Sequence, residues 1–280
     1  MKAAVIIPAF DEARTIRSIA ERALVCCPKV AVIDDGSRDG TADALAGVGV
    51  TLLRHATNQG KAAALATGFE WALAQGAEVV VTLDGDGQHR PEDIPRLLAV
   101  AQLHPDRLII GARLTDRDAY PRARNRANRI ADFWISWAAG HPIEDTQSGQ
   151  RVYPAGLLRR VRRSRDLHAG FTFESEVVIR AARQGVTTIA VPIPAIHNAN
   201  GRPSHFRPVH DIARIVFMVA GYLLRSGMNP RGLWRSVRAA PAIVDSPEPT
   251  IRPAASRERH PVPAIEKSTA HAVSRNAPHP

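Results

Sequence analysis

Two features that mark secreted and membrane-spanning proteins are scarce in this sequence. Only two of its 280 residues are cysteines, and because Cys26 and Cys27 are adjacent, they are poorly placed for an ordinary disulfide. No apolar run reaches the roughly 18 residues that a membrane span needs. The first apolar run, residues 3–8, is too short for a signal peptide and lacks a small-residue cleavage site. These absences lead us to expect a reduced, cytoplasmic protein.

Acidic residues are in deficit, and the usual phosphate-binding loops are missing. The 27 acidic side chains face 37 lysines and arginines, so the formal net charge is +10. This excess favours nucleic acid, an anionic membrane surface or phosphorylated ligands as partners. No nucleic-acid-binding motif accompanies it, so we do not expect nucleic acid. Neither G-x-G-x-x-G nor G-x-x-x-x-G-K-[ST] occurs, and we expect a metal ion and a lysine to hold any phosphate instead.

The sequence does contain an alternation of short apolar runs and helical segments. Runs at residues 3–8, 29–33, 50–53, 79–83 and 107–110 are typical of strands, and segments between them, such as 91–103, have helical spacing. This order predicts an α/β fold with a mostly parallel sheet and one ligand crevice at its carboxyl edge. From Pro241 onward the chain holds eight of its 21 prolines and no periodicity. We therefore expect a globular domain over residues 1–228 and a basic, Pro-rich, disordered tail over residues 229–280.

One predicted strand ends in a pair of aspartates. Residues 79–83 are followed by Asp84-Gly85-Asp86-Gly87-Gln88. Alternate residues of an extended chain point the same way, so both carboxylates can aim at one spot. Such oxygen ligands suit Mg²⁺ or Mn²⁺, and Gln88 can add a neutral oxygen. Lys61 lies in the first turn of a predicted helix, where its positive charge is unfavourable next to the helix dipole. A bound anion would offset this, so Lys61 is a candidate anion ligand.

Polar motifs at the strand ends recur in order along residues 3–225. They are VIIPAFDE at 5–12, VIDDGSRDGT at 32–41, NQGK at 58–61, DGDGQH at 84–89, DTQSGQR at 145–151 and FESE at 173–176. As an ordered set they resemble the family 2 glycosyltransferases of the GT-A fold. The resemblance is to the branch of dolichol-phosphate mannosyltransferases and bacterial polyprenyl-phosphate sugar transferases. It implies a Rossmann-like, mostly parallel sheet flanked by helices.

The resemblance also implies a nucleotide-sugar donor site. Residues expected to line the nucleotide pocket are Pro8, Phe10 and Glu12, with Asp34, Asp35 or Ser37 contacting the base or ribose. The divalent cation on the donor diphosphate would be held by Asp84, Asp86 and Gln88, and Lys61 would add positive charge. The leaving group is a nucleoside diphosphate, whose developing negative charge needs a fixed positive partner.

The acceptor side is basic and aromatic. Residues 122–137 are expected to form a helix with arginines at one end and aromatic residues at the other. Arginine forks suit phosphate and tryptophan suits the membrane interface, and a lipid phosphate needs both. The resemblance implies that the acceptor phosphate is held by Arg113, Arg126, Arg151 and Ser204. A helix over 209–224 either lies on the bilayer or packs on the domain. The basic run 159–165 is either a solvated face or a membrane-proximal patch.

The implied activity is inverting, metal-dependent transfer of a sugar from a GDP- or UDP-sugar to a polyprenyl-phosphate lipid. The enzyme would act as a peripheral protein at an anionic membrane, on the cytoplasmic face of the inner membrane. We expect Asp86, Asp145, Arg126 and Arg151 to be catalytic. A phosphate nucleophile needs no base, whereas a hydroxyl needs a carboxylate, for which Asp145 and Glu174 are candidates. Asp145 could instead orient Arg126 or Arg151.

Two alternatives remain open from the sequence. One is a transferase that acts on a lipid, polyene or glycan hydroxyl, which would share the donor site. The other is a non-enzymatic basic binding module. Nucleotide-sugar turnover with and without metal separates the enzymes from the binding module.

Overall fold

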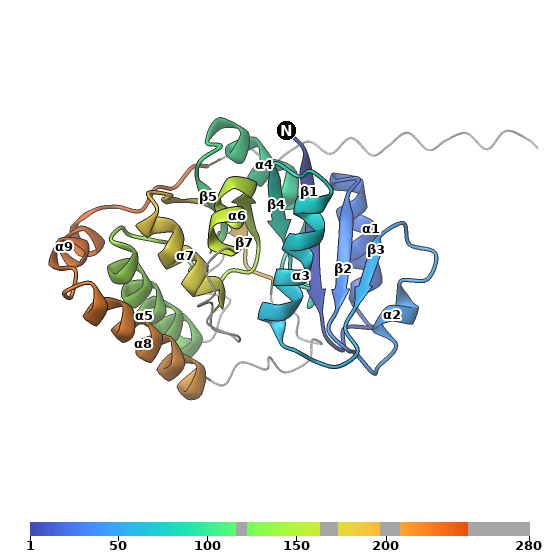
Figure 1. Cartoon of the computed structure of the whole chain (residues 1–280), viewed down its shortest axis with the longest axis horizontal. Helices are drawn as coiled ribbons and strands as arrows, with labels where there is room; N and C mark the ends of the chain where they lie inside the picture. Colours follow the sequence, from blue (N-terminus) through green and yellow to red (C-terminus); the bar gives the residue numbers. More distant parts are fainter. Residues whose placement is uncertain (116–121, 163–172, 197–207, 246–280) are drawn as a thin grey trace, which may run out of the picture. The chain divides into compact units, whose positions relative to one another are not determined.

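The computed structural model describes residues 1–115, 122–162, 173–196 and 208–245. These residues belong to one compact unit, Met1–Pro249. Their strands form a seven-stranded sheet in the order β3-β2-β1-β4-β6-β5-β7 (Figure 1). The strands are β1 Ala3–Ala9, β2 Val30–Asp34, β3 Thr51–Arg54, β4 Val79–Thr82, β5 Leu108–Thr115, β6 Arg151–Pro154 and β7 Thr188–Pro194. Only β6 runs antiparallel to its neighbours, so the predicted mostly parallel sheet is confirmed.

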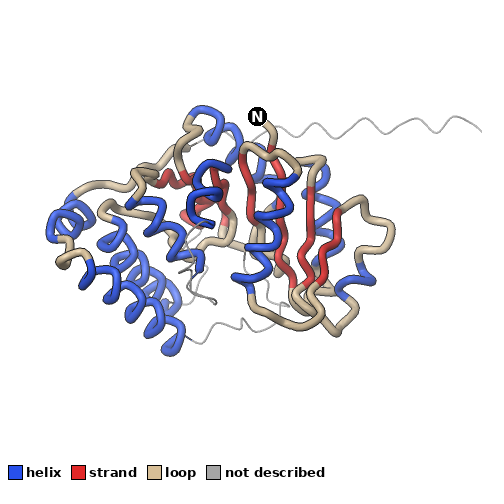
Figure 2. The backbone as a smooth tube through the Cα atoms, in the orientation of Figure 1, coloured by secondary structure: helices blue, strands red, loops and turns tan. Residues whose placement is uncertain are grey.

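Helices cover both faces of this sheet, as Figure 2 shows. On one face, α1 (Ile16–Cys26) and α4 (Ile94–Leu103) pack on Val5 and Ile7 of β1. On the other face, α3 (Lys61–Ala74) packs on Ala4 and Ile6. Alternate β1 residues thus point to opposite cores, as the period of two in a strand requires. The shorter elements are α2 (Thr41–Ala44), the 3-10 turn η1 (Pro91–Asp93) and α6 (Ala155–Arg162).

The second half of the described chain adds a helical layer beside the sheet. Its helices are α5 (Arg122–Ala139), α7 (Phe173–Arg183), α8 (Pro208–Arg225) and α9 (Pro230–Arg238). Helix α5 packs against each of the other three, and α5, α8 and α9 lie side by side in Figure 1. The helices predicted over 122–137 and 209–224 are therefore present, and α8 packs on the domain through the buried Val219 and Leu223. None of the helices in the described ranges is long and apolar enough to cross a bilayer.

The structure differs from the sequence prediction at the start of the expected tail. Residues 230–238 form helix α9, whose N-cap Asn229 accepts a hydrogen bond from the Gly232 N–H at 3.1 Å. Beyond α9 the chain returns to the sheet, where the Ala190 N–H donates to the Ala242 carbonyl at 2.8 Å and the Ala190 carbonyl accepts from the Val244 N–H at 2.9 Å. The cap residue, followed by Pro230 at the first helical position, signals a helix that the proline-rich composition concealed. Residues 246–280 lie outside the described residues.

The sequence also gave no indication of β6 and β7. β6 has only four residues, too few to show a period. β7 contains Pro192 and Pro194, residues that normally argue against a strand. Because β7 is the last strand in the order, an edge strand can accommodate them.

Candidate active site

The centre of the candidate site is a charged cluster where β4 ends. The Lys61 ammonium lies 2.7 Å from Asp84 Oδ1 and 3.0 Å from Glu174 Oε2. Lys61 is the first residue of α3 and Glu174 lies in the first turn of α7, so two helix starts meet at the strand end. Burial acts to raise the pKa of Asp84, but Lys61 outweighs it and lowers that pKa to about 2. Asp84 is therefore a carboxylate at any physiological pH.

Asp86 lies in the same turn and feels the charge of Asp84. Its Oδ1 accepts a hydrogen bond from the Gln88 N–H at 2.9 Å. Burial, and next the neighbouring Asp84 carboxylate, raise the pKa of Asp86. The two carboxylates repel each other, and a bound cation would relieve this repulsion. No group of three or more His, Cys, Asp or Glu side chains suited to a metal occurs among the described residues. Two carboxylates and an amide fit Mg²⁺ or Mn²⁺ on a diphosphate, since Mg²⁺ commonly uses one or two carboxylates plus substrate phosphates.

The turn before β6 lies directly against Asp84. A Cβ added to Gly149 would come within 2.0 Å of Asp84 Oδ2, so only glycine fits there without displacing the carboxylate. The Thr82 hydroxyl donates to the Gly149 carbonyl at 2.7 Å and fixes this approach. Gly149 is a site residue to which sequence reasoning gave no role of its own, although it lies inside the DTQSGQR motif.

His89 is a second residue whose place the sequence did not reveal. Its ring is buried, with Nδ1 at 3.8 Å from Asp84 Oδ2 and Nε2 at 3.3 Å from the Ser148 hydroxyl. Burial lowers the pKa of His89 to about 4. The imidazole is therefore neutral at pH 7 and packs the Asp84 turn against the turn before β6. Its position at the end of the DGDGQH motif was the only signal for it.

The acids after β2 are held by the chain itself. Asp35 accepts from the N–H groups of Gln59 at 3.0 Å and Gly60 at 2.7 Å, and from His55 Nδ1 at 2.7 Å. Its buried carboxylate thereby shapes the loop that leads to Lys61. In this structure both carboxylate oxygens of Asp35 therefore stabilise the loop before α3 and are not exposed for contact with a ligand.

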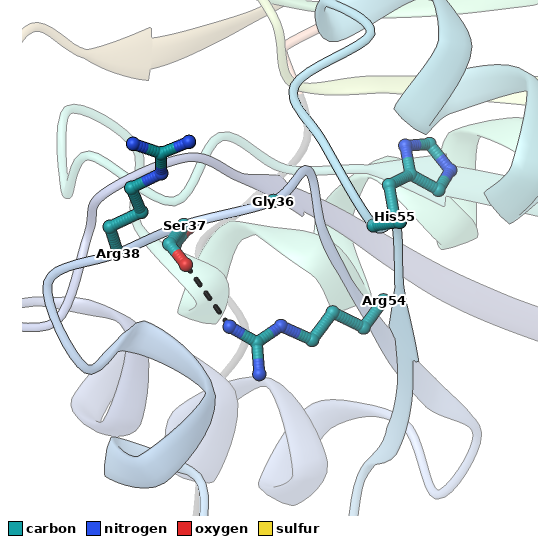
Figure 3. A pocket seen from close by; sticks show the side chains of 6 residues that line it. Gly36, Ser37, Arg38, Arg54 and His55 are labelled. Carbon is teal, nitrogen blue, oxygen red and sulfur yellow. Dashed lines mark hydrogen bonds between the residues drawn. The ribbon is translucent and has the colours of Figure 1, made fainter.

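Asp34 and Ser37 have similar environments. Asp34 is fully buried, accepts from the Ser37 N–H at 2.9 Å and pairs with Arg54 Nε at 3.0 Å. The Ser37 hydroxyl accepts from the Asp11 N–H at 2.8 Å. Ser37, unlike Asp34, also lines the adjacent hollow of about 420 Å³, together with Gly36, Arg38, Arg54, His55 and Ala56. Figure 3 shows Arg54 reaching across to the Ser37 carbonyl, a 3.1 Å hydrogen bond.

The remaining predicted donor residues lie at the end of β1. Pro8 is buried within the strand, whereas Phe10 and Glu12 are half-buried in the turn that follows. The Glu12 N–H donates to the Thr41 hydroxyl at 2.8 Å, which joins this turn to the start of α2. The turns after β1, β2 and β4 therefore meet at one edge of the sheet, as predicted for parallel strands.

On the predicted acceptor side, Arg113 and Asp145 form a buried bidentate pair. Arg113 Nε and Nη2 lie 2.8 and 2.7 Å from the two Asp145 oxygens, and the Arg113 N–H donates to Oδ2 at 2.8 Å. Burial acts to raise the pKa of Asp145, but Arg113 outweighs it and lowers that pKa. Asp145 thus orients Arg113, not Arg126 or Arg151 as we had considered. A carboxylate so committed is a poor general base.

Arg151 does not lie where a phosphate can reach it. Its side chain is fully buried, and it donates to the carbonyls of Ser148 at 2.8 Å, Thr146 at 2.6 Å and Glu174 at 3.0 Å. In this structure the guanidinium ties the turn before β6 to α7, so the contact of Arg151 with the acceptor phosphate stays a prediction that this arrangement does not support. Arg126 is exposed on α5. Ser204 lies outside the described residues.

Comparison with known proteins agrees with this arrangement. The sequence profile of the family described as "Glycosyl transferase family 2" matches residues 4–161, more than half of the chain. The chain belongs to glycosyl transferase family 2. It is a glycosyltransferase, and the predicted family and the class of enzyme are confirmed.

Two curated relatives cover most of the described domain. A polyprenol monophosphomannose synthase of Mycolicibacterium smegmatis is 33% identical over 68% of this chain and 75% of its own length. An undecaprenyl-phosphate mannosyltransferase of Micrococcus luteus is 30% identical over 72% of this chain and 86% of its own length.

Solved structures establish the fold. A mannosyl-3-phosphoglycerate synthase of Rubrobacter xylanophilus superposes with a TM-score of 0.61 at 19% identity, over 81% of this chain and 75% of its own. A glucosyl-3-phosphoglycerate synthase of Mycobacterium tuberculosis, crystallised with Mn²⁺ and UDP, gives 0.57 at 19% identity, over 80% and 79% of the two chains. The GT-A fold expected from the sequence is confirmed.

Proposed function

We propose that this glycosyltransferase moves a sugar from a GDP- or UDP-sugar to a polyprenyl phosphate, with inversion at the anomeric carbon. The observation that carries the proposal is the cluster of Lys61, Asp84 and Asp86 at the carboxyl edge of the sheet, where a cation and a diphosphate can meet. Two relatives above 25% identity are named for transfer to polyprenol or undecaprenyl phosphate, which supports this acceptor class.

In this proposal Asp84, Asp86 and Gln88 hold Mg²⁺ or Mn²⁺. When bound, the metal supplies positive charge to the diphosphate that leaves the sugar. Lys61, paired with Asp84, adds a second positive charge beside the same turn. Gly149 leaves the space that the Asp84 carboxylate occupies, since a Cβ at this position would overlap Asp84 Oδ2.

The environments of the two base candidates favour a phosphate nucleophile. Asp145 binds Arg113 through both oxygens, and Glu174 binds Lys61 through Oε2. A hydroxyl acceptor would need one of them to accept a proton during attack. A lipid phosphate already carries negative charge, so positioning and neutralisation suffice. Arg126, exposed on α5, is the predicted acceptor arginine that can still reach a ligand.

The proposal includes a location. A polyprenyl phosphate is anchored in a bilayer, so the enzyme would meet it as a peripheral protein on an anionic surface, at the cytoplasmic face of the inner membrane. The excess of basic residues, +10 in formal charge, supports such a contact.

The test uses the full chain, a panel of labelled nucleotide sugars and two matched acceptors. Short-chain polyprenyl phosphate and the corresponding polyprenol differ only in the phosphate group. We expect transfer to the phosphate alone, loss of transfer with a chelator, and recovery with Mg²⁺ or Mn²⁺. Equal transfer to the polyprenol would favour the hydroxyl alternative, and no turnover of any nucleotide sugar would refute the proposed reaction.

A further inference from the structure

The outer faces of α8 and α9 are apolar where an ordinary surface helix is polar. Phe217 and Leu224 are 78% and 71% exposed, and Trp234 and Val237 are 60% and 66% exposed. Met228, in the turn between the helices, is also exposed. We call these five residues the α8–α9 surface. The exposed aromatic side chains found among the described residues, Phe133, Phe217 and Trp234, all belong to α5, α8 or α9.

Helical geometry shows that these side chains are not at the margin of a buried face. On α8 the buried residues Val219 and Leu223 lie one turn apart. Phe217 and Leu224 are seven residues apart, share a face, and that face points away from the buried one. An amphipathic helix in water places polar residues there, so α8 has an apolar stripe on each side.

Helix α9 divides into three sectors. Gly232 is buried against the turn at Asn229. Trp234 and Val237 form an exposed apolar sector, and the exposed Arg231, Arg235 and Arg238 form a basic sector beside it. The Arg238 guanidinium lies 5.7 Å from the centroid of the Trp234 ring. Helices that lie at a lipid–water interface commonly have arginines beside an apolar sector that contains an aromatic residue.

The turn before α9 fixes the direction in which the helix presents these sectors. The Trp137 indole N–H donates to the Met228 carbonyl at 3.0 Å, and the Asn229 amide donates to the Trp137 carbonyl at 3.2 Å. Helix α9 is therefore anchored to the end of α5, the helix that carries Arg126.

The charge of the segment selects one occupant for the surface. Residues 208–244, from the start of α8, contain five arginines and one acidic residue, Asp211. A second copy of the chain in an isologous contact would set this basic patch against itself. The chain's own residues 246–280 are also basic, with five lysines or arginines against three glutamates. Anionic headgroups complement the arginines, and the acyl region accommodates Phe217, Leu224, Trp234 and Val237.

We propose that the α8–α9 surface docks on an anionic phospholipid bilayer, with α9 lying in the interface. This inference rests on the proposed function for its purpose, since docking would hold the domain against the bilayer in which a polyprenyl phosphate is anchored. It adds α9, which the sequence analysis placed in the tail, to the membrane contact, and it names the apolar side chains that would enter the bilayer.

The test measures binding of the full chain to vesicles that contain no polyprenyl phosphate. Vesicles of phosphatidylcholine with phosphatidylglycerol are compared with vesicles of phosphatidylcholine alone, by co-sedimentation. The apolar variant is W234A/V237A and its matched control is V25A/L103A, which removes two exposed apolar side chains on α1 and α4. The charge variant is R231Q/R235Q and its control is R159Q, an exposed arginine on α6.

We expect the wild type to bind the anionic vesicles only, and both controls to bind like the wild type. Each arginine lost should weaken binding about fivefold, so R231Q/R235Q should bind on the order of twentyfold more weakly. W234A/V237A should lose about tenfold or more. Transfer to water-soluble, short-chain polyprenyl phosphate without vesicles should be the same in all variants, which separates docking from the reaction.

Three results would overturn the proposal. Equal vesicle binding by wild type and both surface variants would show that the α8–α9 surface does not contact the bilayer. Equal binding of the wild type to neutral and anionic vesicles would show that the contact does not depend on anionic lipid. A wild type that binds no vesicles but forms a dimer that W234A/V237A dissolves would make a second copy the occupant. Failure of short-chain transfer with vesicle binding intact would instead refute the proposed reaction and leave the docking surface standing.

Discussion

The proposed donor half of the site lies at the ends of β1, β2 and β4, and the proposed acceptor half lies at β5, β6 and the turn before β6. Both halves carry charged residues at strand ends. In the donor half the Asp84 turn keeps partly exposed charge beside Lys61, while Asp35 builds the loop next to it. In the acceptor half Arg113 and Arg151 are both buried in contacts with their own chain. The same residue types therefore stay accessible to a ligand in one place and hold loops in another, and burial decides which.

The strongest way to test the donor half is Asp86→Ala. Loss of a charged cation ligand removes several kcal/mol of stabilisation from the leaving diphosphate, so activity should fall on the order of a thousandfold. The fold should persist, because Asp86 lies in a turn rather than in the core. The readouts are nucleotide-sugar turnover and thermal unfolding, with the exposed Asp106→Ala as control. Full activity in Asp86→Ala, or in chelator-treated enzyme, would contradict the metal assignment.

The acceptor half should respond to Arg151→Met mainly in stability. The change leaves the carbonyls of Thr146, Ser148 and Glu174 without their buried donor. We expect the free energy of unfolding to fall by about 3 kcal/mol. Denaturant unfolding measures this, with the exposed Arg159→Met for comparison. An unchanged midpoint together with loss of acceptor use would restore Arg151 as a phosphate ligand.

Arg126→Lys tests whether the exposed arginine is the acceptor contact. The substitution keeps the charge and loses the bidentate fork. We expect the KM for polyprenyl phosphate to rise about tenfold, while the KM for the nucleotide sugar and the stability stay the same. Arg129→Lys, one turn along α5 and also exposed, is the matched variant. Equal effects of both changes would show that only the general charge of the helix matters.

Gly149→Ala tests the contact between the two halves, because Gly149, in the turn before β6, lies against the Asp84 carboxylate. The new methyl group would overlap Asp84 Oδ2, which must then move. We expect the apparent affinity for the metal to weaken about tenfold, by analogy with loss of a group that supports metal ligands. Metal titration of activity measures it. Gly156→Ala on α6, where a Cβ meets nothing closer than 4.0 Å, should behave like the wild type.

A further test concerns the pH dependence of stability through Asp132 of α5, which accepts hydrogen bonds from the N–H and hydroxyl of Thr146 at 2.8 and 2.6 Å. Burial, and next the charges of Asp145 and Glu144, raise the pKa of Asp132 from 3.8 to about 7, against the lowering by Thr146. The folded state thus keeps a proton that the unfolded chain loses. Stability is fully present below the ordinary pKa and is lost as the pH rises through the folded one.

The measurement is the free energy of unfolding of wild type and Asp132→Asn across this pH range. The wild type should lose on the order of 2 kcal/mol relative to the variant between pH 4 and pH 7. Parallel curves for the two proteins would show that folding does not raise the pKa of Asp132.

How far the sequence could predict this molecule depends on the range of the interactions involved. Strands such as β1 and β4 and the Asp84 turn are local patterns, and they were found. The partner of Asp145 was not, because Arg113 lies 32 residues away in the chain and only the β5–β6 pairing brings the two together. The burial of Arg151 was missed for the same reason, since its type and motif indicate a phosphate ligand while its contact with the Glu174 carbonyl depends on α7.

The chain segment after α9 has a consequence for handling this protein. By bonding to Ala190, residues 242–244 cover part of the outer side of β7, the last strand of the sheet. Uncovered strand edges are templates for other chains, and natural proteins shield them to avoid aggregation. A version shortened to residue 240 would leave these backbone groups open on a strand rich in apolar residues. Its solubility, rather than its catalysis, is what the missing segment would change first.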